Sequence, residues 1–174
     1  MEELKKHIRQ IPDFPKEGIN FIDITTIIKK GPQFAQIIDL MYDYFKDKPI
    51  DAVLGIEARG FILASALAYK MGIGVIPVRK PGKLPAETIK EEYSLEYGTD
   101  AVEMHVDALE NYKNILVIDD LLATGGTVRA ACSLVEKAGG TVQGVGFLVE
   151  LDFLNGREKI KNYDILSLVH YDSE

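Results

Sequence analysis

Short apolar runs alternate with amphipathic segments along most of the chain. Apolar runs at residues 52–56, 75–78, 115–118, 142–149 and 165–169 predict strands. Residues 115–118 lack polar alternation, which is typical of a parallel strand covered on both faces. Helical spacing predicts helices over residues 33–46, 61–71 and 128–138, and the last two stop at glycines. This order predicts an α/β fold with a mainly parallel twisted sheet flanked by helices.

Two segments depart from this rhythm. Residues 2–10 are charged and amphipathic, which predicts a short helix ending before Pro12, and the apolar run 19–28 that follows is broken by Asp23, Thr25 and Thr26. After the turn-rich Lys80-Pro-Gly-Lys-Leu-Pro85, residues 92–97 and 102–106 are expected to pair as an antiparallel excursion. A long insertion in a compact domain is usually a lid or a binding loop, with a merely decorative hairpin as the alternative.

The strand at residues 115–118 leads into a candidate ligand site. Asp119 and Asp120 come where the strand ends, which is where open α/β sheets bind ligands. Ala123-Thr-Gly-Gly-Thr127 follows, directly before a predicted helix, so that tight-turning glycines and helix-start amides can hold a phosphate. Each dipeptide alone is explained as a turn or a solvated strand end. Receiver-type phosphoacceptor domains also carry acids here, but they need no glycine-rich loop. The combination indicates a ribose-phosphate site.

Length and charge limit the other possibilities. The 174 residues fit one domain, residues 1–174, that can bury a substantial core. A net charge of −7 argues against a nucleic-acid surface, although a local basic cluster can still hold phosphate. Cys132 is the only cysteine and is expected in the core, and His7, His105 and His170 lack the spacing of a metal site. Without a signal-like or membrane-spanning run, a cytoplasmic location and no membrane partner are expected.

Several motifs together resemble one enzyme family. Val117-Ile-Asp-Asp-Leu-Leu-Ala-Thr-Gly-Gly-Thr127 resembles the phosphoribosyl-pyrophosphate (PRPP) motif of type I phosphoribosyltransferases. Four further segments resemble the adenine phosphoribosyltransferase branch, in the family's order and over nearly the whole chain: Pro12-Asp-Phe-Pro15, Ala58-Arg-Gly-Phe61, Arg79-Lys-Pro-Gly-Lys-Leu-Pro85 and Tyr93-Ser-Leu-Glu-Tyr-Gly98. The resemblance implies the type I phosphoribosyltransferase fold. It also implies an N-terminal hood, formed by residues 1–32 with the C-terminal strand, and a flexible antiparallel lid over residues 80–106.

The resemblance implies purine salvage, in which the 5-phosphoribosyl group of PRPP passes to adenine to give AMP and pyrophosphate. Mg²⁺ would be bound mainly through PRPP or pyrophosphate, with no metal site formed by the protein itself. A homodimer is implied, because some basic residues of the family reach pyrophosphate across the dimer interface.

The same resemblance assigns a role to each candidate site residue. The 5-phosphate would be held by Ala123, Thr124, Gly125, Gly126 and Thr127, and the ribose hydroxyls by Asp119 and Asp120. Pyrophosphate would meet Glu57, Ala58, Arg59, Gly60, Arg79, Lys80 and Lys83. Glu96 would handle a proton at the purine, with Arg59 as the other catalytic candidate. Phe21 would stack on the adenine, flanked by Asn20 and Ile22.

One position departs from the family pattern. Members commonly carry a basic residue between the hood Phe and Asp, whereas this chain reads Phe21-Ile22-Asp23. Ile22 offers no charge or side-chain hydrogen bond, so transfer to another purine, such as xanthine or hypoxanthine, is a second hypothesis. A regulator that senses PRPP without catalysis is a third. The basic loop, Glu96 and the lack of an added DNA-binding segment count against it.

Overall fold

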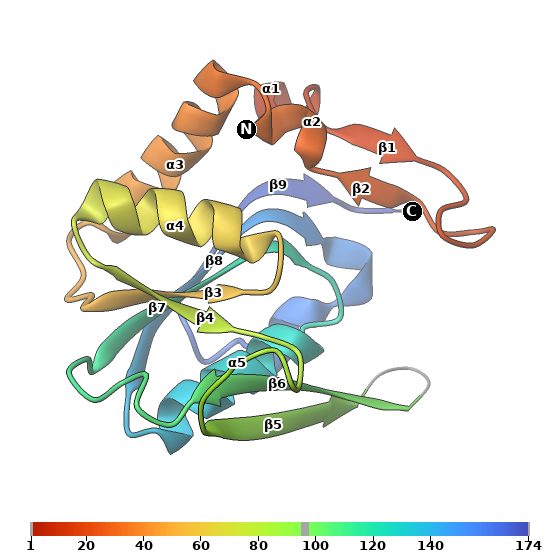
Figure 1. Ribbon diagram of the computed structural model, residues 1–174. Helices are drawn as coiled ribbons and strands as arrows, with labels where there is room; N and C mark the ends of the chain where they lie inside the picture. The colour runs from red at the N-terminus through yellow and green to blue at the C-terminus, as the bar shows by residue number, and fades with distance from the viewer. Residues whose placement is uncertain (1, 95–97, 174) are drawn as a thin grey trace.

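The computed structural model describes residues 2–94 and 98–173. Its centre is a parallel sheet in the order β4-β3-β7-β8-β9 (Figure 1). The strands are β3 (Ala52–Ile56), β4 (Gly74–Val78), β7 (Asn114–Leu122), β8 (Thr141–Leu151) and β9 (Ile165–Tyr171). The predicted α/β fold with its parallel sheet is confirmed, and each expected strand is present with a shift of a few residues at its ends.

Helices cover both faces of this sheet because the side chains of β7 alternate between them. Leu116 and Ile118 join the core beneath α3 (Gly31–Phe45) and α4 (Gly60–Met71). Ile115 and Val117 join the core beneath α5 (Gly126–Lys137), on the opposite face (Figure 1). Each fully buried aliphatic side chain contributes about 1.5–3 kcal/mol, so β7 stabilises both layers. The predicted helices over residues 33–46, 61–71 and 128–138 are confirmed with small shifts at their ends.

The N-terminal segment differs from the expected helix over residues 2–10. The helix α1 covers only Glu2–Lys5, and β1 (Arg9–Ile11) then pairs antiparallel with β2 (Phe21–Asp23), ahead of the short helix α2 (Thr25–Ile28). Hydrogen bonds to β2 replace the helical ones, which local propensity could not foresee. Lys5 Nζ donates to the His170 carbonyl 2.5 Å away, so α1 contacts the end of β9. A hood built from residues 1–32 and β9 stays a prediction.

The expected antiparallel pairing is present, but its strands β5 (Thr88–Ser94) and β6 (Thr99–His105) begin four and three residues before the predicted 92–97 and 102–106, and residues 95–97 lie outside the described ranges. Val102 and Met104 of β6 are buried in the core that α5 covers, and Arg79 exchanges backbone hydrogen bonds with Glu103. The flexibility of residues 80–106 stays a prediction, and the described part of β6 is held in the core by these contacts.

After β8 the chain makes two short 3₁₀ turns, η1 (Asp152–Leu154) and η2 (Gly156–Lys159), which the sequence did not indicate. No helix in the described ranges combines the length and the apolar character needed to cross a bilayer.

Candidate functional site

Asp119 and Asp120 lie on β7 just beyond the end of its neighbour β3. The pairing of β7 with β3 ends at Ile118, whereas its pairing with β8 continues through Asp119 to Leu122. The acids are therefore still strand residues, and one side of the strand is open at their level. Asp120 is buried, with 5% of its surface exposed, and Asp119 is partly exposed. The predicted acid pair thus lies at the carboxyl edge of the sheet.

Burial dominates the electrostatics of this pair. Burial and, next, the charge of Asp120 raise the pKa of Asp119. Burial also raises the pKa of Asp120, while the guanidinium of Arg59 acts in the opposite direction from an Nε–Oδ2 distance of 2.7 Å. That contact is an ion pair without hydrogen-bond geometry, and Asp120 Oδ2 has no hydrogen-bond partner among the described residues. Arg59 is therefore the charged partner of Asp120, and a small reorientation of its guanidinium would let Oδ2 accept from a ligand hydroxyl.

The predicted phosphate loop follows directly and ends in the first turn of α5. Gly125 has a left-handed backbone with φ of 76°, and α5 begins at the next residue. A small cavity at this loop is lined by Asp119 and residues 121–128. Amide groups at the start of a helix attract anions, so this cavity suits a phosphate. The structure brings all five predicted phosphate-loop residues to one place.

Glu57, Ala58, Arg59 and Gly60 form the connection from β3 to α4, with a cis peptide between Glu57 and Ala58. The start of α4 closely approaches the acids, because a Cβ on Gly60 would lie 2.8 Å from Asp119 Oδ1. Position 60 therefore requires glycine if α4 is to begin beside β7.

Glu57 gathers the basic residues of the next loop. Its carboxylate accepts hydrogen bonds from Arg79 (3.3 Å), the Lys80 backbone N–H (2.8 Å) and Lys83 (2.5 Å). Burial alone would raise the pKa of Glu57, but these hydrogen bonds outweigh it and lower the pKa to about 2. The carboxylate therefore stays charged and holds Arg79 and Lys83 at the carboxyl edge of β3.

The Lys80 side chain turns instead toward the hairpin. Its ammonium donates to the Tyr93 hydroxyl at 2.8 Å and to the carboxylate of Asp100. Burial lowers the pKa of Lys80, but these two hydrogen bonds prevail and raise it. A cavity of about 370 Å³ unites this loop with the acids and is lined by Ile56, Glu57, Ala58, Arg59, Lys80, Asp119, Asp120, Leu121 and Thr127. Parts of each predicted anion-binding element thus border this cavity, and it shares Asp119, Leu121 and Thr127 with the cavity of the phosphate loop.

Phe21 reaches this region from the N-terminal hairpin. Its ring lies 5.4 Å from Arg59 Cζ and packs edge-on against Phe14 at 5.2 Å between centroids. Asn20 donates to Gln10, and its buried Oδ1 has no partner in the described part of the chain. The Ile22 side chain is 4% exposed and packs into the core, so only its main chain can face a base.

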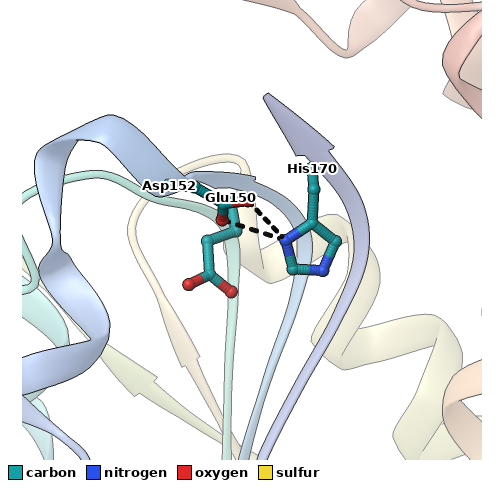
Figure 2. Close-up of side chains that lie close together, drawn as sticks. All are labelled: Glu150, Asp152 and His170. Carbon is teal, nitrogen blue, oxygen red and sulfur yellow. Dashed lines mark hydrogen bonds and ion pairs between the residues drawn. The ribbon is translucent and has the colours of Figure 1, made fainter. Parts of the chain in front are cut away.

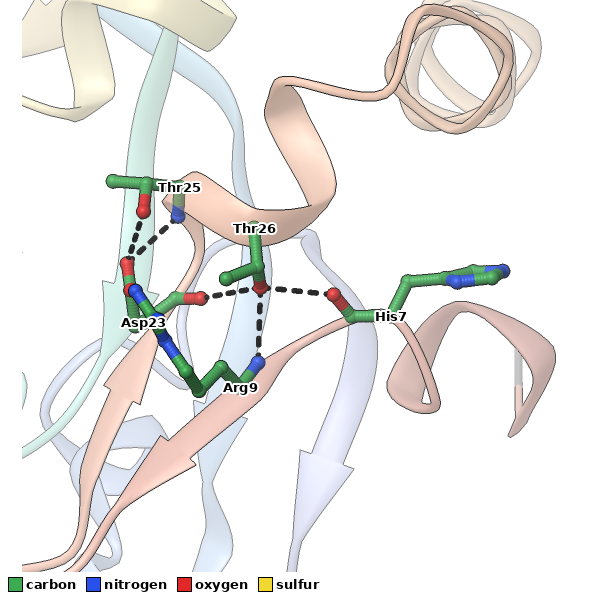
Figure 3. A network of polar contacts seen from close by, with 5 residues as sticks. All are labelled: His7, Arg9, Asp23, Thr25 and Thr26. Atoms are coloured by element: carbon green, nitrogen blue, oxygen red, sulfur yellow. Dashed lines mark hydrogen bonds and ion pairs between the residues drawn. The ribbon is translucent and has the colours of Figure 1, made fainter.

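A polar network holds the strand that carries Phe21 (Figure 3). Asp23 accepts hydrogen bonds from Arg9 at 2.6 Å and from the Thr25 hydroxyl at 2.6 Å, and Thr26 donates to the His7 carbonyl. Hydrogen bonds from Thr25 first, and then from Arg9, lower the pKa of Asp23 to about 2. The sequence interpretation had treated Asp23 only as a break in an apolar run. The spacing Asp-x-Thr, typical of a side chain that bonds to the backbone two residues on, was the available signal.

Glu96, the predicted acid–base residue, lies outside the described residues.

His170 lacks metal-site spacing in the sequence but lies in a cluster with Glu150 and Asp152 at the ends of β8 and β9 (Figure 2). The oxygen and nitrogen atoms that could bind a metal lie within 4.8 Å of one another. His170 Nδ1 is 2.9 Å from Asp152 Oδ1, and Glu150 is bound by Arg157. Sheet pairing creates this cluster, so sequence spacing could not reveal it.

Comparison with known proteins agrees with this geometry. The phosphoribosyl transferase domain family matches residues 25–170. The adenine phosphoribosyltransferase of Solibacter usitatus is 55% identical over 172 residues, which cover 99% of this chain and 99% of that protein.

Two solved structures extend the comparison. The crystal structure of adenine phosphoribosyltransferase from Thermoanaerobacter pseudethanolicus has a TM-score of 0.93 at 51% identity, covering 98% of this chain and 99% of that one. The enzyme from Saccharomyces cerevisiae, complexed with an imino-altritol bisphosphate and adenine, has a TM-score of 0.89 at 40% identity, covering 96% of this chain and 97% of that one. With this agreement in sequence and structure, the chain belongs to the adenine phosphoribosyltransferase branch of the phosphoribosyl transferase domain family.

Proposed function

We propose that this protein transfers the 5-phosphoribosyl group of PRPP to adenine, forming AMP and releasing pyrophosphate in purine salvage. One observation carries the proposal: the acid pair, Glu57, Ala58, Arg59 and Thr127 border one cavity, and Asp119, Leu121 and Thr127 also line the adjoining cavity of the phosphate loop, with Phe21 beside Arg59. The S. cerevisiae relative was solved with adenine and a sugar-like bisphosphate bound, which is the ligand pair that such a site would take.

The reaction breaks the bond between ribose C1 and the pyrophosphate oxygen and joins C1 to a purine nitrogen. We assign the 5-phosphate to residues 123–127 and the ribose hydroxyls to Asp119 and Asp120, two carboxylates that line the cavity beside Arg59. Positive charge develops on the ribose as pyrophosphate leaves, and carboxylates at close range favour it. Arg59 lies beside these acids and can donate to the departing phosphate oxygens.

The remaining pyrophosphate contacts come from the loop after β4. Arg79 and Lys83 are already gathered by Glu57, and Lys80 lines the cavity. Bound pyrophosphate would replace the carboxylate partners of these cations with phosphate oxygens. Each residue predicted for pyrophosphate is thus close to the cavity before the substrate arrives.

The protein fits a magnesium ion carried by the substrate. Glu57 and Asp120 are paired with cationic side chains, so the protein offers no cage of free carboxylates in the described part of this cavity. Mg²⁺ keeps several waters and takes phosphate oxygens readily, so PRPP would hold it in the cavity that Asp119 and Asp120 line. The bound ion would supply neutralisation of the pyrophosphate charge.

For the base, we propose stacking on Phe21 and a hydrogen bond to Asn20 Oδ1, a buried acceptor without a partner in the described residues. The amino group of adenine can donate to such an acceptor, whereas the carbonyl of a 6-oxopurine cannot. The Ile22 side chain packs into the core. At this position, where the family commonly has a basic residue, only the main chain of Ile22 can therefore contact the base. Glu96 remains the proposed proton carrier at the purine nitrogen.

We also propose a homodimer, through α4 and the edge strand β4. Apolar side chains occur on all sides of α4, and Ile62 and Tyr69 are exposed, with 89% of Tyr69 accessible. Val75 is exposed on β4, which packs against α4. Exposed apolar faces on adjoining elements favour association. Sedimentation of the wild type and Tyr69→Asp tests this, and a monomeric wild type would contradict it. A cytoplasmic location stays a prediction for cell fractionation.

The decisive experiment incubates the purified protein with PRPP, Mg²⁺ and one purine at a time. We expect AMP from adenine and much slower product formation from hypoxanthine and xanthine. Faster turnover of a 6-oxopurine than of adenine would show that the 6-oxopurine is the preferred substrate. PRPP binding by calorimetry with no turnover of any base would identify a PRPP-sensing regulator instead.

A further inference from the structure

Gly156, in the turn after β8, lies directly against the backbone of the phosphate loop. It is buried, and a Cβ at this position would lie 2.1 Å from the Ala123 carbonyl oxygen and 2.9 Å from the Gly125 nitrogen. Conversely, a Cβ on Gly125 would lie 2.4 Å from the Gly156 carbonyl oxygen. These neighbours are backbone atoms, which cannot rotate away as the tip of a side chain can. Only glycine therefore fits at both positions.

The turn that carries Gly156 is anchored on both sides. The next residue, Arg157, donates from Nε and Nη2 to the two carboxylate oxygens of Glu150, at 2.9 Å and 2.6 Å. Glu150 is 4% exposed and lies next to the last residue of strand β8, beside Asp152 and His170 (Figure 2). On the other side, Ile160 is buried in the core beneath α5. A two-bond Arg–carboxylate pair fixes orientation as well as distance, so the turn has a defined place relative to the sheet.

This anchored turn contacts the phosphate loop from outside the ligand cavity. Asp119 and residues 121–128 line the cavity, whereas Gly156 touches Ala123 and Gly125 at their backbone. A glycine-rich loop has many accessible conformations, and an anion site requires that its amides converge before the anion binds. Something outside the loop must select the binding conformation, and the turn at Gly156 is in contact with the first residue of the loop, Ala123, and its central residue, Gly125.

We propose that Gly156, held by the Arg157–Glu150 pair, is a positioning residue that sets the conformation of the 5-phosphate loop. The inference rests on the proposed function, since the phosphate concerned is that of PRPP. The proposal predicts that a change in the turn weakens the binding of ligands that carry the 5-phosphate. The binding of pyrophosphate should be unaffected, because its proposed site lies on the other side of the ribose.

The test compares the binding of two probes, ribose 5-phosphate and inorganic pyrophosphate with Mg²⁺, to the full-length protein by calorimetry. For Gly156→Ala we expect the ribose 5-phosphate Kd to rise by roughly 10- to 100-fold, the scale of a displaced binding group. The pyrophosphate Kd should stay within about twofold, and the KM for PRPP should rise more than kcat falls. Arg157→Lys keeps the charge but loses the two-bond geometry with Glu150. It should therefore raise the ribose 5-phosphate Kd as well, but by a smaller factor.

Gly144→Ala is the matched control, because a Cβ there would lie 2.7 Å from Phe45 Cε1 in the core. It should lower the melting temperature and leave the ratio of the two affinities unchanged. If Gly156→Ala changes both affinities by the same factor, or changes neither, the inference is overturned. If Gly156→Ala does not fold, the ratio of the ribose 5-phosphate Kd to the pyrophosphate Kd is measured in Arg157→Lys instead, and an unchanged ratio there overturns the inference. A wild type that forms no AMP overturns the proposed function instead, which is a separate result.

Discussion

Asp23→Asn should weaken the binding of adenine while leaving the binding of PRPP intact. The substitution keeps the shape of the side chain but removes the charge that holds Arg9 at 2.6 Å (Figure 3). An amide oxygen can still accept from Thr25, so the turn into α2 is retained in part. Phe21 lies two residues earlier on the same short strand, so loosening the pair between β1 and β2 reduces the order of the stacking ring.

The magnitude follows from the pKa of Asp23. Hydrogen bonds from Thr25, and then from Arg9, lower this pKa from 3.8 to about 2. At about 1.36 kcal/mol per unit, the charged form stabilises the fold by at most about 2.5 kcal/mol. The Arg9 side chain is 59% exposed, so solvent screening reduces the expected loss to about 1–2 kcal/mol.

The sign of the pH dependence is fixed by the lowered pKa. Stability from the Asp23 carboxylate is present above its unfolded pKa, near 4, and is lost as the pH falls toward about 2. The wild type should therefore exceed Asp23→Asn by about 1–2 kcal/mol at about pH 7, and by roughly half that at about pH 3, in urea unfolding.

Steady-state kinetics give the second measurement. The KM for adenine should rise by roughly threefold to tenfold, within the range expected for a disturbed base stack, with the Kd for PRPP unchanged. An unfolding difference that is equal at both pH values would refute the electrostatic argument. An unchanged adenine KM would refute the link to Phe21.

Three further changes test the pyrophosphate side of the site. Glu57→Gln should destabilise the fold by about 1–3 kcal/mol at neutral pH in urea unfolding, because a partly buried charged acceptor of several hydrogen bonds is lost; an unchanged free energy of unfolding would show that these hydrogen bonds do not stabilise the fold. Asp100→Asn should tighten pyrophosphate binding by about twofold to fivefold in calorimetry, since Lys80 no longer has to leave an ion pair; weaker binding would contradict this. Gly60→Ala should raise the KM for PRPP by roughly tenfold or more, because its Cβ pushes on the acid pair, and normal kinetics would remove that role.

The central strands could be predicted because their pattern has a single physical solution. The apolar run at residues 115–118 has no polar face, so it must be covered on both sides, and the structure places Leu116 and Val117 in opposite cores. The acids and glycines that follow belong to the same local sequence as the strand. Their meeting at one edge needs only the rule that parallel strands end at the same side of the sheet.

Contacts between distant segments could not be predicted in this way. The helix expected over residues 2–10 ends at Lys5, because Arg9 pairs with Asp23 across a hairpin. Asp100 contacts Lys80 only because β6 joins the core beside the loop after β4. Gly156 follows an asparagine in an ordinary turn signal, and its contact with Ala123 depends on where β8 ends. In each case the sequence shows the residue type, and the fold selects its partner.

The described basic residues of the pyrophosphate side are already paired with carboxylates: Arg79 and Lys83 with Glu57, Lys80 with Asp100 and Arg59 with Asp120. These pairs explain how a chain with a net charge of −7 can keep several cations ordered at one edge. Exchange toward a phosphate replaces one charge-assisted hydrogen bond by another, and pyrophosphate offers these cations more negative charge than a single carboxylate does. The carboxylates therefore order the cations before the substrate binds, and the larger charge of pyrophosphate favours the exchange.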